Sequence, residues 1–455
     1  MSVSVGFISL GCSKNLVDSQ VMAGYLKAGH IELAASPETA DVILVNTCSF
    51  IEAAREEAAE AILSACAHKA DGNCRAVIVT GCMVQRYRRR LEKAFPDVDA
   101  FLGIDELARI GEVVTCVAKG KRCGVIAGEG DAVKVYNPTY PTLLFTGGPF
   151  AYLKIADGCD HRCAYCAIPN IRGHFRSRVM EDIVSEAAGM VRAGVKEINL
   201  ISQDSLLYGA DHSGKPRIAE LMRRIDDLDG DFRFRLLYGY PAGVTDDVLE
   251  ALNTARHVCK YLDLPIQHSH PAILKAMNRA PAVKATEGMA ARLRQAVQGL
   301  VLRTTCLVGF PGETEAQFEH LLATVAESKF DHLGVFAFSP EEGTPAFDLE
   351  EADPEVAEER CQRLMALQKK IVRERAKSLT GARDVALLLR RGASGVWLAR
   401  LPRQAPDVDG ETFVTGVTEA AEVGDFVPVE ITGGKGYDLE ARFETRNSKQ
   451  EARKG

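Results

Sequence analysis

Three cysteines stand close together in the stretch DGCDHRCAYCAIP, residues 157–169, at the spacing C-x3-C-x2-C. An iron–sulfur cube held by protein normally takes four thiolates, one on each iron. Cys159, Cys163 and Cys166 can wrap one cube within a single loop, and three thiolates leave one iron open for another ligand. A structural zinc ion needs a fourth ligand, and no second C-x2-4-C pair or His-x3-5-His lies nearby. The spacing therefore favours a cluster with a vacant position over a zinc loop or unrelated core thiols.

A second cysteine triplet is scattered along the chain, but its members share a position. Cys12 follows VGFISLG, Cys48 follows VILVNT and Cys82 follows VIVTG, so each lies just beyond a β-rich run. If these runs are neighbouring parallel strands, their carboxyl ends meet at one crevice and the three thiols converge there. Gly11 and Gly81 precede two of the cysteines and would let the backbone approach a bulky ligand closely. The alternative is that the three are small buried apolar residues.

The two triplets lie in separate segments that alternate strand and helix patterns. Residues 1–125 alternate β-rich runs with helical patterns, which is typical of βαβ units on a parallel sheet. A Pro/Gly-rich stretch follows, and we predict a linker over residues 126–150. Residues 151–352 resume the alternation with strand candidates such as YLKIA, EINLIS and LRTTCLVGF. This rhythm predicts a partial (β/α)6 barrel.

The rest of the chain changes character twice. Residues 353–380 form a predicted connecting helix, with Asp353 as its N-cap and Pro354 at its first position. From 381 to 443, short β-rich runs alternate with Gly/Pro turns, which predicts a small β-barrel. Residues 444–455 are polar and form a predicted frayed tail. The predicted fold class is α/β, with a parallel-sheet N-terminal domain, a central barrel-like domain and a C-terminal β-barrel.

Composition narrows the cellular setting. No run of about 18 apolar residues is present that could span a bilayer, and the start MSVSVGFISLGC lacks the features of a secretory signal. We therefore expect a cytoplasmic protein without membrane contact. A net charge of -7 argues against bulk attraction to nucleic acid. A reducing compartment keeps cysteines as thiols, so we expect structural thiols at the positions outside the two triplets, namely Cys66, Cys74, Cys116, Cys123, Cys259, Cys306 and Cys361.

The C-x3-C-x2-C motif with an aromatic residue, Tyr165, before its last cysteine resembles that of the radical S-adenosylmethionine enzymes. The resemblance implies that S-adenosylmethionine chelates the open iron and is cleaved reductively to a 5′-deoxyadenosyl radical. It also implies that the adenine lies near Tyr165, for which plain packing is the alternative. Gln203 follows the strand EINLIS and Gly309 opens GFPGE at another strand end, so both are candidates for cofactor binding at the barrel mouth. An ordinary tight turn explains Gly309 about as well.

The resemblance narrows to the methylthiotransferases and covers almost the whole chain. LGC, NTC and TGC match the family's N-terminal domain, GCDHRCAYCAIPNIRG and LVGFPGETE match its radical domain, and residues 381–443 match its TRAM barrel. Family membership implies two 4Fe-4S clusters, one on Cys159, Cys163 and Cys166, and an auxiliary one on the other triplet. It implies that sulfur is delivered and methylated at the open iron of the auxiliary cluster. S-adenosylmethionine then serves both as methyl donor and as radical source.

Within this family, one branch modifies tRNA adenosine and another modifies the β-carbon of an aspartate in small-subunit ribosomal protein S-twelve. SLGCSKNLVDSQ, ISQDSLLYG, LLYGYP and YLDLPIQH look like the second branch, whereas the tRNA branch more often has Gln-Met-Asn after the first cysteine. The barrel over 381–443 contains seven Lys/Arg and ten Asp/Glu, which suits a basic protein better than phosphates. We therefore expect ribosomal protein S-twelve, free or in the small subunit, as partner, together with an electron donor and a sulfur source. RNA contact is not expected to dominate.

Other residues have a functional and an ordinary interpretation. Arg86, Arg88, Arg89, Arg90 and Lys93 crowd one predicted helix after Cys82, where they could meet rRNA or the acidic target, or simply form a solvated face. Asp204 follows the same strand as Gln203 and could likewise bind substrate or cofactor, and His268 is interpreted as a hydrogen-bonded structural histidine rather than a catalytic base. An electron-transfer or RNA-binding iron–sulfur protein without chemistry of its own is the rival class. Such a protein would make no 5′-deoxyadenosine from S-adenosylmethionine.

Overall fold

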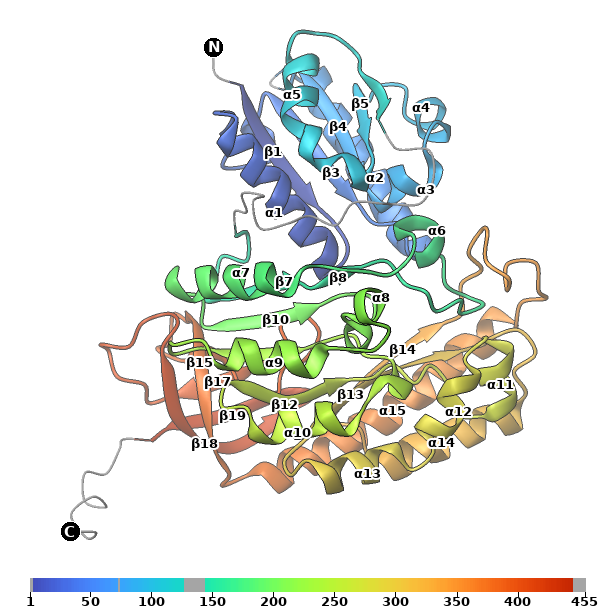
Figure 1. Cartoon of the computed structure of the whole chain (residues 1–455), viewed down its shortest axis with the longest axis vertical. Helices are drawn as coiled ribbons and strands as arrows, with labels where there is room; N and C mark the ends of the chain where they lie inside the picture. The colour runs from blue at the N-terminus through green and yellow to red at the C-terminus, as the bar shows by residue number, and fades with distance from the viewer. Residues whose placement is uncertain (1–2, 73, 127–143, 445–455) are drawn as a thin grey trace.

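The computed structural model describes residues 3–72, 74–126 and 144–444. Figure 1 shows an N-terminal sheet domain at the top, a central layer of strands and helices below it, and a β-barrel at the lower left. Of the predicted linker 126–150 and tail 444–455, residues 127–143 and 445–455 lie outside the described residues. Among the helices of the described residues, we find none that combines the length and the apolar character needed to cross a membrane.

The N-terminal domain is a parallel sheet covered by helices, as predicted. Its strand order is β2-β1-β3-β4-β5-β6, with β3 and β4 buried along their whole length between two hydrophobic clusters. Burial on both faces explains the continuous apolar runs VILVNT and AVIVTG. The elements are β1 (Ser4–Ser9), α1 (Ser13–Ala28), β2 (Glu32–Leu33), β3 (Val42–Thr47), α2 (Glu52–Ala70), β4 (Ala76–Gly81), α3 (Cys82–Tyr87), α4 (Arg90–Ala94), β5 (Ala100–Leu102), α5 (Ile110–Ala118) and β6 (Gly124–Ile126).

The central domain is an open parallel sheet, which confirms the predicted partial barrel. Its strands follow in the order β14-β13-β12-β11-β10-β7, while β8 and β9 form a separate two-stranded sheet. The elements are β7 (Phe150–Lys154), β8 (Ala156–Asp157), α6 (Ile168–Arg172), β9 (Arg176–Ser177), α7 (Met180–Arg192), β10 (Glu197–Ile201), α8 (Ala210–Ser213), α9 (Ile218–Asp226), β11 (Arg233–Leu236), α10 (Asp246–Thr254), β12 (Val258–Asp263), α11 (Pro271–Ala276), α12 (Ala280–Thr286), α13 (Met289–Ala296), β13 (Val301–Val308), α14 (Glu315–Ser328) and β14 (His332–Ala337).

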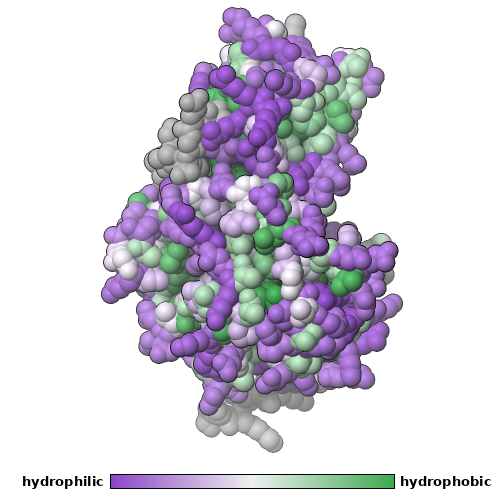
Figure 2. Space-filling view, turned by 90° about the vertical axis from the view of Figure 1, so that its right-hand side faces the viewer, coloured by the Kyte–Doolittle hydropathy of each residue, from purple (hydrophilic) through white to green (hydrophobic). Residues whose placement is uncertain are grey.

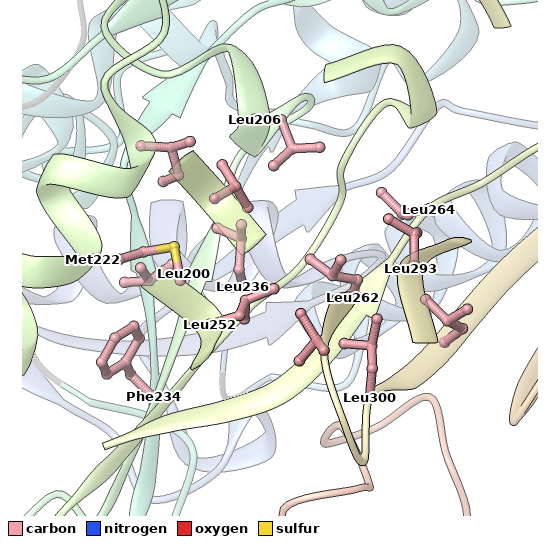
Figure 3. Packing of buried hydrophobic residues seen from close by; sticks show 14 of the residues in the cluster. Leu200, Leu206, Met222, Phe234, Leu236, Leu252, Leu262, Leu264, Leu293 and Leu300 are labelled. Atoms are coloured by element: carbon pink, nitrogen blue, oxygen red, sulfur yellow. The ribbon is translucent and has the colours of Figure 1, made fainter. Parts of the chain in front are cut away.

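The core of the central domain lies between this sheet and its outer helices. Leu200, Leu236 and Leu262 come from adjacent strands and belong to one buried cluster with Met222 and Leu252 of the covering helices α9 and α10 (Figure 3). Burial of such side chains contributes roughly 1.5 to 3 kcal/mol each. This packing holds the strands of the central sheet in place.

A long helix and a barrel complete the chain. Helix α15 (Pro354–Leu379) begins as predicted, because the Asp353 carboxylate accepts a hydrogen bond from the Glu355 amide at 2.9 Å. The closed barrel has the order β15-β16-β17-β19-β18. Its strands are β15 (Arg383–Arg391), β16 (Trp397–Arg400), β17 (Thr412–Thr415), β18 (Phe426–Lys435) and β19 (Asp438–Phe443).

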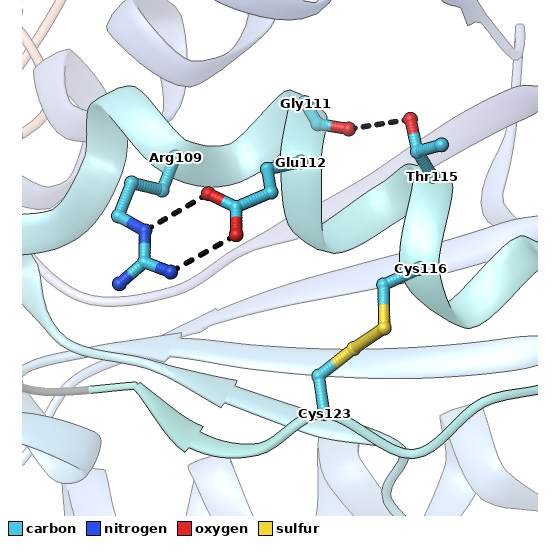
Figure 4. The surroundings of a disulfide bond; sticks show 6 residues. All are labelled: Arg109, Gly111, Glu112, Thr115, Cys116 and Cys123. Carbon is cyan, nitrogen blue, oxygen red and sulfur yellow. Dashed lines mark hydrogen bonds and ion pairs between the residues drawn. A yellow bond between two sulfur atoms is a disulfide. The ribbon is translucent and has the colours of Figure 1, made fainter.

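Two of the cysteines expected as structural thiols form a disulfide. Cys116 lies in the last turn of α5 and Cys123 directly precedes β6, and their sulfurs are bonded (Figure 4). The prediction of free thiols is therefore wrong for this pair. The reason is the tight connection between α5 and β6, which brings the two Cα atoms to 6.8 Å. The other five, Cys66, Cys74, Cys259, Cys306 and Cys361, are free thiols.

Candidate iron–sulfur and cofactor site

The loop between β8 and α6 carries Cys159, Cys163 and Cys166 around one cavity of about 320 Å³. The opposite wall comes from the loop after β14, where Gly343 and Pro345 line the same cavity. The Asn170 amide donates to the Gly343 carbonyl at 2.8 Å and ties the two walls together. Three thiols around one cavity are what a cluster with three protein ligands requires.

A buried arginine of the central domain contacts this loop. Arg279, at the start of α12, donates from one guanidinium nitrogen to Cys163 Sγ at 3.5 Å and from the other to the Pro265 carbonyl at 2.8 Å. Its guanidinium carbon also lies 4.3 Å from the centre of the Tyr240 ring. Tyr165 packs against the neighbouring apolar cluster that contains Phe310. This contact accounts for the packing interpretation of Tyr165, beside the adenine contact that the resemblance implies.

The residues after β10 face the cysteine loop. Asp204 Oδ2 lies 2.7 Å from His161 Nε2, and the His161 ring stacks on Tyr240 with centroids 4.1 Å apart. Gln203 donates to Asp157 Oδ1 at 2.9 Å, whereas its own amide oxygen is buried without a hydrogen-bond partner among the described residues. An unsatisfied buried acceptor costs free energy, so Gln203 remains a candidate for contact with a bound ligand.

Gly309 has a different location from the other cofactor candidates. It has a φ of 69°, and a Cβ there would lie 2.7 Å from the Ala357 Cβ of α15. A side chain is therefore excluded by both the backbone conformation and the packing of α15. Gly309 lines a small cavity of about 120 Å³ beside α15 and is not among the residues that line the Cys159 cavity. This position favours the tight-turn interpretation.

The second triplet lies at the carboxyl ends of three adjacent strands. Cys12 caps α1 after β1, Cys48 follows β3, and Cys82 begins α3 directly after β4. The sheet order places β1, β3 and β4 side by side, which is the arrangement that the sequence required for convergence. Gly11 has a φ of 86°, and a Cβ there would lie 2.7 Å from the Cys48 Cβ. The glycine therefore allows the first loop to pass close to the second cysteine.

Burial keeps most of these thiols protonated in the free protein. It raises the pKa of Cys82, Cys159 and Cys166 to about 12 each, and it also raises the pKa of Cys48. Metal ligation needs thiolates, so a bound cluster would replace these protons. Within residues 3–72, 74–126 and 144–444, no group of His, Cys, Asp or Glu side chains is arranged to hold a single metal ion. The Cys159 cavity is wider than one ion, and its donor set fits a cluster.

A buried charge network lies between Cys82 of the second triplet and the segment that carries the first triplet. Arg172, at the end of α6, donates to Cys82 Sγ at 3.5 Å, to Asp18 at 2.9 Å and to Asp157 at 2.9 Å. Lys154 of β7 contacts the same two carboxylates. Although burial alone would raise it, the charges of Arg172 and Lys154 hold the pKa of Asp157 well below its usual range. Since Cys82 also packs against Ile171 of α6, the two cysteine sets face one interdomain interface.

Lys14 adds a further positive charge at this interface. Its side chain is 7% exposed, and its Nζ lies 2.8 Å from the centre of the Tyr238 ring. Burial lowers the pKa of Lys14 to about 8, and the nearby Cys12 and Asp263 oppose that shift.

The predicted basic helix after Cys82 is broken and partly paired. Arg88 has a φ of 47°, so the segment divides into α3 and α4. The Arg86 guanidinium, 7% exposed, donates to Glu341 at 2.7 Å, and Arg90 pairs with Glu342 at 2.9 Å. The interpretation as a solvated face is wrong for Arg86, which is buried and paired, whereas Arg90 is 72% exposed and remains on a solvated face. Glu341 and Glu342 lie about 250 residues away in sequence, so no local pattern could indicate the pairing.

Local sequence reasoning missed several residues of the site. Arg172, Arg279, Lys154 and Asp18 contact cysteines or each other from different elements, and none forms a motif by itself. The only signal was position, since Arg172 lies within the quoted stretch GCDHRCAYCAIPNIRG and Asp18 lies within the quoted stretch SLGCSKNLVDSQ. His268 contacts Glu313 at 3.1 Å and accepts from the His270 amide at 2.9 Å, in line with a structural role.

Comparison with known proteins defines the class. Residues 4–103 match the family described as Uncharacterized protein family UPF0004, residues 153–325 match the Radical SAM superfamily, and residues 383–443 match the TRAM domain. These matches, with an open parallel sheet that carries a three-cysteine loop, define a radical S-adenosylmethionine enzyme with an N-terminal accessory domain. An iron–sulfur cluster and S-adenosylmethionine belong to this class.

The particular family follows from similarity along the whole chain. The chain is 42% identical over 438 residues to a protein of Geobacter sulfurreducens named ribosomal protein uS12 methylthiotransferase RimO, covering 96% of this chain and 97% of the relative. It is also 42% identical to the RimO of Pelotomaculum thermopropionicum, covering 96% of this chain and 99% of the relative. The chain therefore belongs to the RimO family of methylthiotransferases.

Solved structures support the fold. The radical S-adenosylmethionine methyltransferase TsrM from Kitasatospora setae, with cobalamin and a [4Fe-4S] cluster bound, superposes with a TM-score of 0.56 at 14% identity. The match covers 76% of this chain and 74% of TsrM. At this identity the likeness concerns the fold alone.

Proposed function

We propose that this protein attaches a methylthio group to the β-carbon of an aspartate in ribosomal protein S-twelve, the uS12 in the names of its relatives. The observation that carries the proposal is similarity to RimO proteins along nearly the full length of both chains. An activity shared only through the radical domain would not require similarity in the N-terminal domain and the barrel. The cytoplasm is the expected location, because ribosomes are assembled there.

Two clusters would be held by the two triplets, Cys159, Cys163 and Cys166 on one side and Cys12, Cys48 and Cys82 on the other. When reduced cluster and S-adenosylmethionine are bound, they supply a radical that removes hydrogen from an unactivated carbon, which no side-chain base could do at neutral pH. Two arginines of the chain position the cysteine side chains that would hold the clusters. Arg279 contacts Cys163, and Arg172 contacts Cys82. An electron donor and a sulfur source are further partners that this reaction requires.

The charge of the barrel supports a protein substrate. Residues 381–443 contain ten acidic and seven basic side chains, a balance of -3. Ribosomal proteins are basic, and an acidic surface attracts them more than it attracts a phosphate backbone. A tRNA substrate is the alternative within the same chemistry.

Mass spectrometry tests the proposal directly. We expect ribosomal protein S-twelve from cells that contain this enzyme to carry a methylthio group on one aspartate, and the same protein from a deletion strain to lack it. Complementation with the wild-type gene should restore the methylthio group on S-twelve, whereas a gene that carries Cys159→Ala should not. A methylthio group missing from bulk tRNA, with S-twelve unchanged, would support the tRNA alternative and contradict the proposal.

A further inference from the structure

Lys14 is a buried cation that has no direct ion-pair partner among the described residues of the free protein. It is the second residue of α1, and 93% of its surface is inaccessible to solvent, since it is 7% exposed. Its ammonium forms no hydrogen bond or ion pair with any side chain in the described part of the chain, and its close contact is the Tyr238 ring at 2.8 Å. Burying an ammonium group is costly unless a partner of opposite charge is provided.

The nearby carboxylates already have other partners. Asp18 and Asp157 are each shared between Arg172 and Lys154. Asp263 Oδ2 accepts a hydrogen bond from the Tyr238 amide at 3.2 Å, and Asp263 Oδ1 forms no hydrogen bond among the described residues but pairs with Arg303 at 3.7 Å. Among the described residues, none of these three carboxylates forms an ion pair with Lys14.

Lys14 is held between the second cysteine triplet (Cys12, Cys48 and Cys82) and the carboxyl ends of the strands in the central domain. Ser13 Oγ lies 3.2 Å from the Tyr238 hydroxyl, so the start of α1 is tied to the loop after β11. Cys12 is the residue just before this pair. Ligands of barrel-like α/β folds collect at the carboxyl ends of the strands, which is where Tyr238 lies. A target carbon that receives sulfur from the Cys12 triplet must come to this place.

We propose that Lys14 binds the carboxylate of the target aspartate and thereby selects an acidic side chain. This inference rests on the proposed function. The carboxylate is bonded directly to the β-carbon, so a cation that holds the carboxylate also positions the carbon to be modified. Charge-assisted pairing of a buried ammonium with a carboxylate is stronger than a neutral hydrogen bond. Lys14 is therefore a specificity-determining residue of the substrate site.

A competing role for Lys14 is to neutralise the negative charge of a cluster on the auxiliary triplet. The two roles differ in what they make sensitive to Lys14. If Lys14 binds the substrate, the effect of removing it depends on the charge of the target side chain. If Lys14 neutralises a cluster, removing it changes the cluster content, and the effect is the same with any target.

A double-mutant cycle separates these roles. We would measure kcat/KM for methylthio transfer and the Kd for substrate binding, using wild-type enzyme and Lys14→Met with S-twelve and its target Asp→Asn variant. Removing one partner of a close charge pair commonly costs roughly 30-fold or more. We expect a loss of that size for Lys14→Met with the aspartate substrate and a loss of at most about threefold with the asparagine substrate. Lys14→Arg should recover part of the loss because it keeps the charge.

The matched control is Lys27→Met, which removes an exposed lysine from the last turn of the same helix and should leave every value unchanged. Iron content per chain is measured for each variant. Equal losses with both substrates, or a loss of iron in Lys14→Met that Lys14→Arg prevents, would overturn the substrate role. If wild-type enzyme transfers nothing to S-twelve, the proposed function itself fails and this inference fails with it.

Discussion

At the scale of single residues, each cysteine triplet presents one sulfur to a buried guanidinium. Arg172 contacts Cys82 and Arg279 contacts Cys163, both at 3.5 Å. Arginine stays charged at any physiological pH, so it would compensate the negative charge of a thiolate that binds a cluster. Hydrogen bonds to cluster sulfurs also influence reduction potential. The two triplets are thus similar in local chemistry, although their cysteines are close in sequence in one case and scattered in the other.

The cysteines themselves permit a prediction that separates the two triplets. A Cys159→Ala variant should produce no 5′-deoxyadenosine from S-adenosylmethionine under reducing conditions. A variant with Cys12→Ala, Cys48→Ala and Cys82→Ala should retain this cleavage but form no methylthiolated product. Chromatography of the nucleoside and mass analysis of the substrate provide the two measurements. Cys66→Ala, outside both triplets, is the control, and methylthiolated product from the triple variant would refute the assignment.

At the scale of elements, a buried carboxylate anchors the barrel to the central sheet. Glu197 of β10 is fully buried and pairs with Arg233 and Arg235 of β11 and with Arg400 of β16. Burial alone would raise the pKa of Glu197, but the three arginines hold it well below its usual range. The network therefore couples neighbouring strands and joins two domains through one side chain.

We predict that Glu197→Gln destabilises the protein by about 3 to 5 kcal/mol, because it leaves buried arginines uncompensated. Glu430→Gln, which breaks a largely exposed pair with Arg442 within the barrel, should cost less than about 1 kcal/mol. Because the pKa of Glu197 is lowered on folding, its contribution is fully present above the ordinary value of 4.5 and is lost progressively as pH falls from there toward the lowered pKa of the folded state. Denaturant unfolding at pH 7 and pH 4 provides the measurement. Equal stability of the two variants at pH 7 would contradict this role.

At the scale of the whole molecule, ion pairs hold the N-terminal domain against the loop after β14. Figure 2 shows the side of the molecule that lies to the right in Figure 1. This side is mostly hydrophilic, with apolar residues in small patches. Glu341 is 2% exposed and receives hydrogen bonds from Arg55 of α2 and Arg86 of α3. Because the same loop lines the Cys159 cavity through Gly343, these pairs connect the N-terminal domain with the cavity wall.

Glu341→Gln should loosen this domain contact, because Arg86 would remain buried without its carboxylate. We expect the interface to lose about 3 kcal/mol. Hydrogen exchange measured by mass spectrometry should then be faster in α3 and α6, while the core strands β3 and β12 keep their protection. Glu342→Gln removes a pair whose arginine is 72% exposed and serves as the control, with a loss of at most about 1 kcal/mol. Unchanged exchange in α3 would show that the pair does not hold the domains together.

The order of domains and the strand-end positions of the cysteines were determined by the sequence itself. Apolar runs such as VILVNT alternate with helical patterns, and this local periodicity predicts a parallel sheet whose carboxyl ends lie together. Cys12, Cys48 and Cys82 follow such runs directly, so their common edge could be inferred without coordinates. The spacing of Cys159, Cys163 and Cys166 predicts a cluster site by itself, because the three residues lie in one loop.

Only the tertiary structure decided which charges meet. Arg172 reaches Asp18 and Cys82, Arg86 reaches Glu341, and Lys14 reaches the Tyr238 ring, each across a large separation in sequence. A charged residue has no periodic signature for its partner, because the partner is chosen by how two domains pack. The Cys116–Cys123 disulfide and the break at Arg88 are local, but they depend on the backbone conformation of the α5–β6 connection and of Arg88 itself. Local patterns determine elements, whereas the compensation of buried charge depends on contacts between them.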